Sequence, residues 1–152
     1  MFPFGSNHRR IVSEATETAA RFLSQTISDI SALADVYAEE VVIEMPFAAP
    51  LFPQVRHTTR EELRAGFTRT TNRRYTRIEN ARILETTDPT VAVIEYDLHG
   101  VRETDDSEFT LSYVQVITVE NGLITHSRDY GSPLQAAEAF GLQDQLIAAL
   151  QN

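Results

Sequence analysis

Apolar residues recur at intervals of three and four in the first part of the chain, which predicts helices. The segment from Ser6 to about Ile27 is expected to be an amphipathic helix, with an apolar face made of Ile11, Val12, Ala15, Ala19, Phe22 and Leu23. Asp29 can cap a second, shorter helix that extends to Tyr37. Thr59 and Glu62 form the T-x-x-E pattern of a capping box, which predicts a third helix through Phe67.

Alternating and β-branched residues dominate most of the remaining chain and predict strands. A first strand contains Val41-Val42-Ile43 and ends near Pro46, and the segment from Ala48 to His57 is interpreted as a loop. Four longer strands are expected at about 73–86, 90–100, 108–119 and 123–130. Asn121-Gly122 is typical of a tight hairpin between the last two. Pro133 then begins a short helix that ends near Gly141.

This order of elements predicts an α+β domain. Three N-terminal helices pack in a curved antiparallel sheet, an α+β cone or roll with a pocket at its open end. The 152 residues suit a single domain, 1–152. Its core spans about 11–141, and 142–152 form a C-terminal amphipathic tail that holds Leu146, Ile147 and Leu150.

The charge balance excludes several partners. The chain has 22 acidic and 13 basic residues, a net charge of −9, and all the basic residues are Arg. A chain with this net charge and no basic run is not expected to bind nucleic acid or an acidic membrane surface. The absence of Cys excludes disulfides, thiolate metal sites and a cysteine nucleophile.

The sequence also predicts no membrane span and no signal peptide. No window approaches 18 uninterrupted apolar residues. The apolar start Met1-Phe2-Pro3-Phe4-Gly5 precedes the basic His8-Arg9-Arg10, whereas a signal peptide has the reverse order. A cytoplasmic location is the default expectation.

Three segments carry a resemblance to a known family. They are Tyr37 to Pro46 (YAEEVVIEMP), Asn121-Gly122-Leu123-Ile124 and Arg128-Asp129-Tyr130. Through them the chain resembles the SnoaL-like branch of the nuclear-transport-factor-two-like superfamily, over about residues 11 to 141. The resemblance implies the cone fold, a homodimer, and neither a metal nor a cofactor. This fold hosts isomerases, cyclases, dehydratases, epoxide hydrolases and non-enzymes.

Limonene-epoxide-hydrolase-like members offer the most direct comparison of residues. Asp129 falls on the aspartate of their R-D-Y segment, and Asp97 on the aspartate of their Arg-x-Asp. The resemblance implies that Asp129 activates water and that Asp97 protonates the leaving oxygen. Glu95 replaces the arginine that lies between those two acids, and Glu44 replaces an asparagine.

Other subfamilies share part of the pattern. Phenazine-biosynthesis A/B-like proteins resemble the chain at Glu95, Asp97 and Pro133, and their pocket glutamate falls on Asp129. Steroid-isomerase-like members have a general-base aspartate where this chain has Met45, which argues against that chemistry.

The strand period places Glu95, Asp97 and His99 on one face of their strand. Either these acids face water and the intervening apolar residues face the core, or the acids line the pocket. The resemblance favours the pocket, with Glu44, Glu95, Asp97 and Asp129 as catalytic acids. Carboxylates that share an apolar pocket raise one another's pKa, which yields the acid–base pair that isomerisation, dehydration or epoxide opening requires.

The expected ligand is a small hydrophobic metabolite. The residues expected to bind it are Phe47, Phe67, His99 and Tyr113. Arg69, Arg73, Arg74 and Arg77 form a local basic cluster, either a solvated helix end or a clamp for an anionic ligand.

Two functional classes remain open: a cofactor-independent acid–base enzyme, and a non-catalytic ligand-binding or dimerisation module. A homodimer is also expected because the second sheet face, taken to carry Tyr96, Leu98, Ile124 and Tyr130, needs cover.

Overall fold

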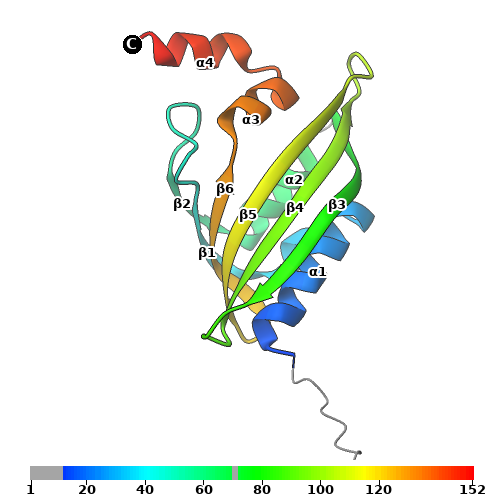
Figure 1. Ribbon diagram of the computed structural model, residues 1–152, viewed down its shortest axis with the longest axis vertical. Coiled ribbons are helices and arrows are strands. Elements are labelled where there is room, and N and C mark those ends of the chain that lie inside the picture. Colours follow the sequence, from blue (N-terminus) through cyan, green and yellow to red (C-terminus); the bar gives the residue numbers. More distant parts are fainter. Residues whose placement is uncertain (1–11, 70–71) are drawn as a thin grey trace, which may run out of the picture.

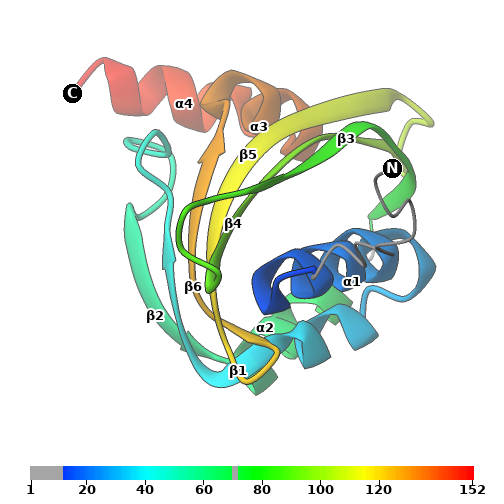
Figure 2. The ribbon, with the colours of Figure 1, turned by 60° about the horizontal axis from the view of Figure 1, so that its bottom comes forward.

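The computed structural model describes residues 12–69 and 72–152 and shows helices enclosed by a curved sheet (Figures 1 and 2). The helix α1, Glu14–Ser28, the short 3-10 helix η1, Ala32–Val36, and the helix α2, Arg60–Arg69, lie within the curve of the sheet (Figure 2). The part of the first predicted helix before residue 12 lies outside the described residues. The α+β cone expected from the sequence is confirmed.

The sheet has six strands in the order β2-β1-β6-β5-β4-β3. Their bounds are β1 Tyr37–Glu44, β2 Val55–Thr59, β3 Arg73–Glu85, β4 Val91–Arg102, β5 Glu108–Glu120 and β6 Leu123–Gly131. All neighbouring pairs are antiparallel except β1 and β6, which are parallel, so the sheet is mixed rather than wholly antiparallel. The end of the expected loop forms β2, because His57 pairs with Val42 in the β1 ladder.

Local sequence signals set the ends of the helices. Ser13 caps α1, its hydroxyl accepting a hydrogen bond from the Thr16 amide at 3.1 Å. The helix then buries one face against the sheet, formed by Ala15, Thr18, Ala19, Phe22 and Thr26. Asp29 accepts hydrogen bonds from two backbone amides at the start of the following turn, as its position in the sequence predicts.

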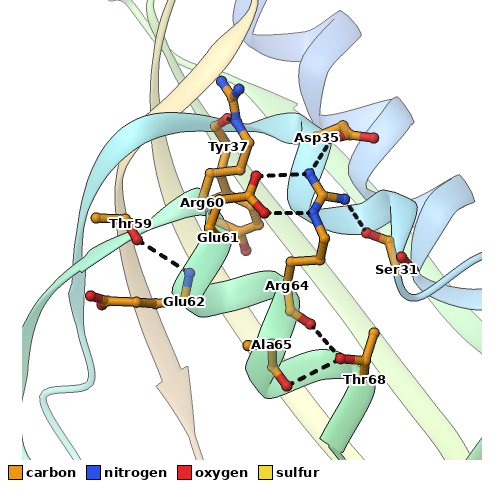
Figure 3. A network of polar contacts seen from close by, with 10 residues as sticks. All are labelled: Ser31, Asp35, Tyr37, Thr59, Arg60, Glu61, Glu62, Arg64, Ala65 and Thr68. Atoms are coloured by element: carbon orange, nitrogen blue, oxygen red, sulfur yellow. Dashed lines mark hydrogen bonds and ion pairs between the residues drawn. The ribbon is translucent and has the colours of Figure 1, made fainter.

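A polar network fixes α2 against η1 (Figure 3). The Arg64 guanidinium donates to the Ser31 carbonyl at 2.8 Å and to Asp35 at 2.6 Å (Figure 3). Thr59 accepts from the amide of Glu62 at 3.2 Å, which confirms the predicted cap of this helix. Because these contacts hold α2 in place, Phe67 on the same helix is positioned beside Tyr37, with ring centroids 6.5 Å apart.

Strict alternation along the central strands separates the inner face of the sheet from the outer one. On β4, the buried residues are Ala92, Ile94, Tyr96 and Leu98. On β5 they are Phe109, Leu111, Gln115, Ile117 and Val119. The apolar members of this set pack against α1 and belong to the hydrophobic core of the domain. Tyr113 belongs to the same inner series of β5 and is half-buried, and the residues that alternate with this series lie on the convex outer face.

Two short helices follow the sheet: α3, Pro133–Phe140, and α4, Gln143–Leu150 (Figure 1). Ser132 caps α3 by accepting from the Gln135 amide at 3.2 Å, and Pro133 occupies its first turn as predicted. The helix ends at Gly141, which has a φ of 67°. In the described part of the chain, no helix is long and apolar enough to cross a membrane.

Candidate functional site

A cavity of about 420 Å³ lies between the inner face of the sheet and the helices. Its wall is largely aromatic and aliphatic and includes Phe22, Leu33, Tyr37, Phe67, Tyr75, Tyr96, Leu98, Tyr113 and Phe140. The charged side chains of its lining are Arg56, Glu62, Arg73 and Asp129. Arg56 and Glu62 are exposed, whereas Arg73 and Asp129 are partly buried. A concave apolar site with a few polar groups is the usual form of a small-molecule pocket.

Asp129 is the expected catalytic acid that lies in this cavity. It projects from the inner face of β6 and lies directly opposite Gln115 on β5. The Ser127 hydroxyl and the Gln115 side chain both donate hydrogen bonds to its carboxyl group. The Tyr96 hydroxyl donates to Oε1 of Gln115 at 3.0 Å, which leaves the amide NH₂ group of Gln115 to face Asp129. The Asp129 carboxyl group is therefore oriented by Ser127 on one hand and by Gln115, itself held by Tyr96, on the other.

Burial has a strong effect on the protonation of Asp129. Desolvation raises the pKa of its carboxyl group to about 6, although the hydrogen bonds from Ser127 and Gln115 and the nearby His126 act to lower it. Burial also raises the pKa of the Tyr96 hydroxyl, which therefore stays protonated and can keep donating to Gln115. Asp129 can thus gain or lose a proton close to neutral pH.

Glu95 and Asp97 lie on the convex face rather than in the cavity. Glu95 pairs with Arg82 at 3.4 Å, and Asp97 accepts from Nδ2 of Asn80 at 2.8 Å. The hydrogen bonds from Asn80 and Ser112 lower the pKa of Asp97, so this group does not supply a proton near neutral pH. Their strand buries the alternate residues Ile94, Tyr96 and Leu98, and the alternation sends both acids outward.

Glu44 also lies on the outer face, because its neighbour Ile43 is buried on the inner face of β1 and lines the cavity. Oε2 of Glu44 lies 2.7 Å from Nε2 of His126 and 3.2 Å from Nε of Arg128. The hydrogen bonds from these two residues lower the pKa of Glu44. The expectation that four acids converge in one pocket is therefore wrong for Glu44, Glu95 and Asp97, and only Asp129 of the four lines the cavity.

The four residues expected to bind the ligand divide in the same way. Phe67 and Tyr113 line the cavity. Phe47 is 60% exposed and packs edge-on against Tyr130, with ring centroids 5.3 Å apart. His99 lies on the outer side of β4, where its Nδ1 is 3.0 Å from the Thr110 hydroxyl. Phe47 and His99 therefore lie outside this cavity, and the ligand contacts expected of all four residues stay predictions.

Gln115 is a site residue that the sequence analysis did not identify, although the sequence contains a signal for it. Among the residues that β5 buries at alternate positions, Gln115 is the polar one, and it is 5% exposed. A lone amide in such a series needs a buried polar partner. Within residues 12–69 and 72–152, no three His, Asp or Glu side chains gather as a metal site.

A curved sheet that encloses helices, with the Asp129 carboxyl in a largely apolar cavity, defines an α+β cone protein. The chain belongs to the SnoaL-like domain family, whose model matches residues 20–127. A sequence relative is an uncharacterized PhzA/B-like protein from Pseudomonas aeruginosa. It is 29% identical over 107 residues, which are 70% of this chain and 75% of the relative.

Two solved structures have the same fold. A phenazine biosynthesis-related protein from Pseudomonas aeruginosa matches with a TM-score of 0.68 and 15% identity, over 85% of this chain and 82% of that one. An LEH-like epoxide hydrolase from M. tuberculosis matches with a TM-score of 0.63 and 17% identity, over 90% of this chain and 94% of that one. At these identities the two structures establish the shared cone architecture, and chemistry must be argued from the cavity.

Proposed function

We propose that this protein is an enzyme that uses Asp129 as a general base and acid on a small, largely apolar metabolite. The observation that carries the proposal is the position of Asp129: a carboxyl group inside an apolar cavity, oriented by Ser127 and Gln115, with its pKa raised to about 6. A pKa near the working pH suits a group that must both take up and release a proton.

The chemistry follows from the two protonation states of Asp129. At neutral pH its carboxylate is mostly ionised, and it is a stronger base than a solvated aspartate because burial disfavours its charge. It can remove a proton from a C–H bond next to a carbonyl group or from an attacking water molecule. The neutral carboxyl group that results returns this proton to the product. Isomerisation, cyclisation, dehydration and epoxide opening all contain such a pair of transfers, and none of them needs a cofactor.

The shape and lining of the cavity support a hydrophobic substrate. A volume of about 420 Å³ fits a small molecule, and aromatic side chains such as Tyr37, Phe67 and Tyr113 form much of the wall. The Tyr96–Gln115–Asp129 chain supplies a fixed polar point in this apolar surface. Such a point selects the orientation of a substrate more than it contributes to affinity.

The experiment is to follow proton transfer directly, because it does not require the natural substrate. Hydrophobic enolisable ketones are incubated with the protein in D₂O, and loss of the α-proton is followed by NMR; diol formation is measured for hydrophobic epoxides in parallel. Wild-type protein is expected to accelerate one of these reactions, and Asp129→Asn to lower its rate by about a hundredfold or more. Asp97→Asn, an isosteric change on the outer face, is the matched control and should leave the rate unchanged.

An alternative is a non-catalytic ligand-binding module of the same fold. It is favoured by one observation: of the four acids expected in the pocket, only Asp129 lies there, so the expected cluster of catalytic carboxylates is not assembled. Saturable binding of ketones or epoxides in the cavity, with no exchange or opening above the uncatalysed rate in wild-type protein, would support this alternative and refute the enzyme.

A further inference from the structure

Arg73 is a charged residue of the cavity that the proposed chemistry does not use. It is the first residue of β3. Tyr75 follows two positions later, and the pairing with β4 is regular between them, so both side chains lie on the same face of the strand. Its guanidinium carbon lies 4.0 Å from the centre of the Phe140 ring, at the end of α3. The ring covers one side of the guanidinium group, and the group lines the cavity.

The polar contacts of Arg73 are incomplete. Its Nε is buried and has no hydrogen-bond partner among the described residues. A buried N–H without an acceptor is costly in a folded protein, and more so when the donor carries a charge. An acceptor that the ligand brings would complete these contacts.

Most other arginines of the described chain have a carboxylate partner, whereas Arg21, Arg56, Arg60 and Arg69 share with Arg73 the lack of one. Six have a carboxylate oxygen within 4 Å: Arg64, Arg74, Arg77, Arg82, Arg102 and Arg128. Arg73 has no such carboxylate partner among residues 12–69 and 72–152. Its positive charge is therefore available to an anion inside the cavity.

We infer that Arg73 anchors the anionic group of an otherwise apolar ligand in this cavity. A carboxylate or a related oxyanion suits the planar fork of the guanidinium group, and the aromatic wall accepts the remainder of the molecule. The inference rests on the proposed use of the cavity as a ligand site, and it narrows the ligand from a hydrophobic metabolite to a hydrophobic acid.

The positions of Arg73 and Asp129 in the sheet also limit the shape of this ligand. Arg73 pairs across the sheet with Arg102, the last residue of β4. Asp129 pairs with Gln115 on β5, which in turn pairs with Ile94 near the other end of β4. The two charged groups are thus separated along the strands within one cavity. A ligand held by Arg73 keeps its own negative charge away from the Asp129 carboxylate and presents its far end to it.

The Tyr113 hydroxyl lies near enough to both charges for each of them to influence its pKa. Burial is the main cause that raises this pKa, Tyr75 and then Asp129 raise it further, and Arg73 lowers it. A ligand that extends from Arg73 toward Asp129 therefore passes along the ring of Tyr113, which lines the same wall.

Two fluorescent probes of matching skeleton test the inference. 8-Anilinonaphthalene-1-sulfonate carries an anionic group, and N-phenyl-1-naphthylamine is the same aromatic framework without it. Wild-type protein is expected to bind the sulfonate more tightly. Arg73→Gln should weaken binding of the sulfonate by about tenfold or more and leave binding of the neutral amine unchanged. Arg74→Gln, the neighbour on the outer face paired with Glu103, is the matched control and should change neither.

Further variants separate this inference from a folding defect and from the proposed function. Arg73→Lys keeps the charge but loses the fork, so its affinity for the sulfonate should lie between those of wild type and Arg73→Gln. The inference is overturned if wild type and Arg73→Gln bind the sulfonate equally well, or if wild type does not bind it saturably. It is also overturned if Arg56→Gln, rather than Arg73→Gln, loses affinity for the sulfonate. Asp129→Asn should still bind the sulfonate. If that variant keeps its turnover, the general-base proposal fails and the binding result stands.

Discussion

Asp129 and Gln115 lie directly opposite each other across the β5–β6 pair, and the Gln115 side chain donates to the carboxyl group of Asp129. The Ser127 hydroxyl donates to the same carboxyl group. Both bonds favour the ionised form and thereby oppose the desolvation that raises the pKa of Asp129. The protonation of Asp129 is therefore set by a balance between burial and two named donors.

Removal of either donor should raise the pKa of Asp129 above about 6. The effect should be larger for Ser127→Ala than for Gln115→Met, because the hydrogen bond from Ser127 is the stronger of the two influences that lower this pKa. A titration of ¹³C-labelled aspartate carboxyl groups by NMR measures both shifts, and the resonance of Asp97 serves as the internal control. A pKa that falls in either variant would contradict the proposed balance.

The stability of the protein should depend on the protonation of Asp129. The pKa of this group is raised on folding from 3.8 to about 6, so the folded state binds more protons between these values. Stability should therefore fall as pH rises from about 4 to about 6, by up to about 3 kcal/mol, and then stay level with respect to this group.

Asp129→Asn should remove this part of the pH dependence, and Asp97→Asn should retain it. Urea unfolding at several pH values measures the difference. An unchanged slope in Asp129→Asn would contradict the pKa assigned to this carboxyl group.

Catalytic activity should depend on pH with the opposite sign. If ionised Asp129 is the base, kcat/KM for an active substrate should rise as pH increases through about 6 and reach a plateau above it. In Ser127→Ala the same rise should occur at higher pH, because the pKa of Asp129 is higher there. A pH profile that is flat between pH 4.5 and pH 8 would show that another group transfers the proton.

Two glycines should respond to alanine substitution in opposite ways. A Cβ at Gly100 would lie 2.4 Å from the Phe109 ring and 2.8 Å from the Arg74 carbonyl oxygen, so Gly100→Ala should destabilise the protein by about 1–3 kcal/mol. A Cβ at Gly66, on α2, meets nothing within 4 Å, and Gly66→Ala should stabilise the protein by about 0.5–1 kcal/mol. Thermal unfolding compares the two variants, and an equal effect of both would contradict this assignment.

The homodimer expected from the family resemblance stays a prediction. The argument from an uncovered second sheet face is weakened, because Tyr96, Leu98 and Ile124 face the core and only Tyr130 of that set lies outside. Val114 is an apolar residue that is 38% exposed on the outer face of β5. Light scattering should give twice the mass of one chain, and Val114→Glu should favour the monomer. A monomeric wild type would refute the dimer.

The sequence predicted the elements of the fold well because their signals are local. Thr59 caps α2 through a contact with the amide of Glu62, three positions away, and Pro133 occupies the first turn of α3. The strand β2 was missed because its pairing with β1 depends on backbone contacts between distant residues, and its own five residues carry no alternating pattern that would distinguish them from a loop.

The sequence correctly divided the residues of β4 between two faces. It wrongly favoured the face with Glu95 and Asp97 as the one that lines the pocket. Burial of the apolar side chains of Tyr96 and Leu98 stabilises the fold, whereas burial of the neighbouring carboxylates would cost free energy. Hydrophobic burial therefore determined which face turned inward. On β6, an irregularity in its pairing with β5 between His126 and Ile124 brings both Ile124 and Ser127 to the inner face. No residue pattern in the sequence indicates that irregularity, so the positions of Asp129 and His126 depend on the folded sheet.

The parallel contact between β1 and β6 determines when the cavity can form during folding. Tyr37 pairs with Ile124, so the first strand joins the sheet only after the last strand is available. Much of the closing surface, including Phe140 on α3, comes still later in the chain. Contacts between such distant residues slow folding. During synthesis on the ribosome, β1 and β2 must therefore wait as an unattached hairpin, and ligand affinity should develop only in the last stage of folding.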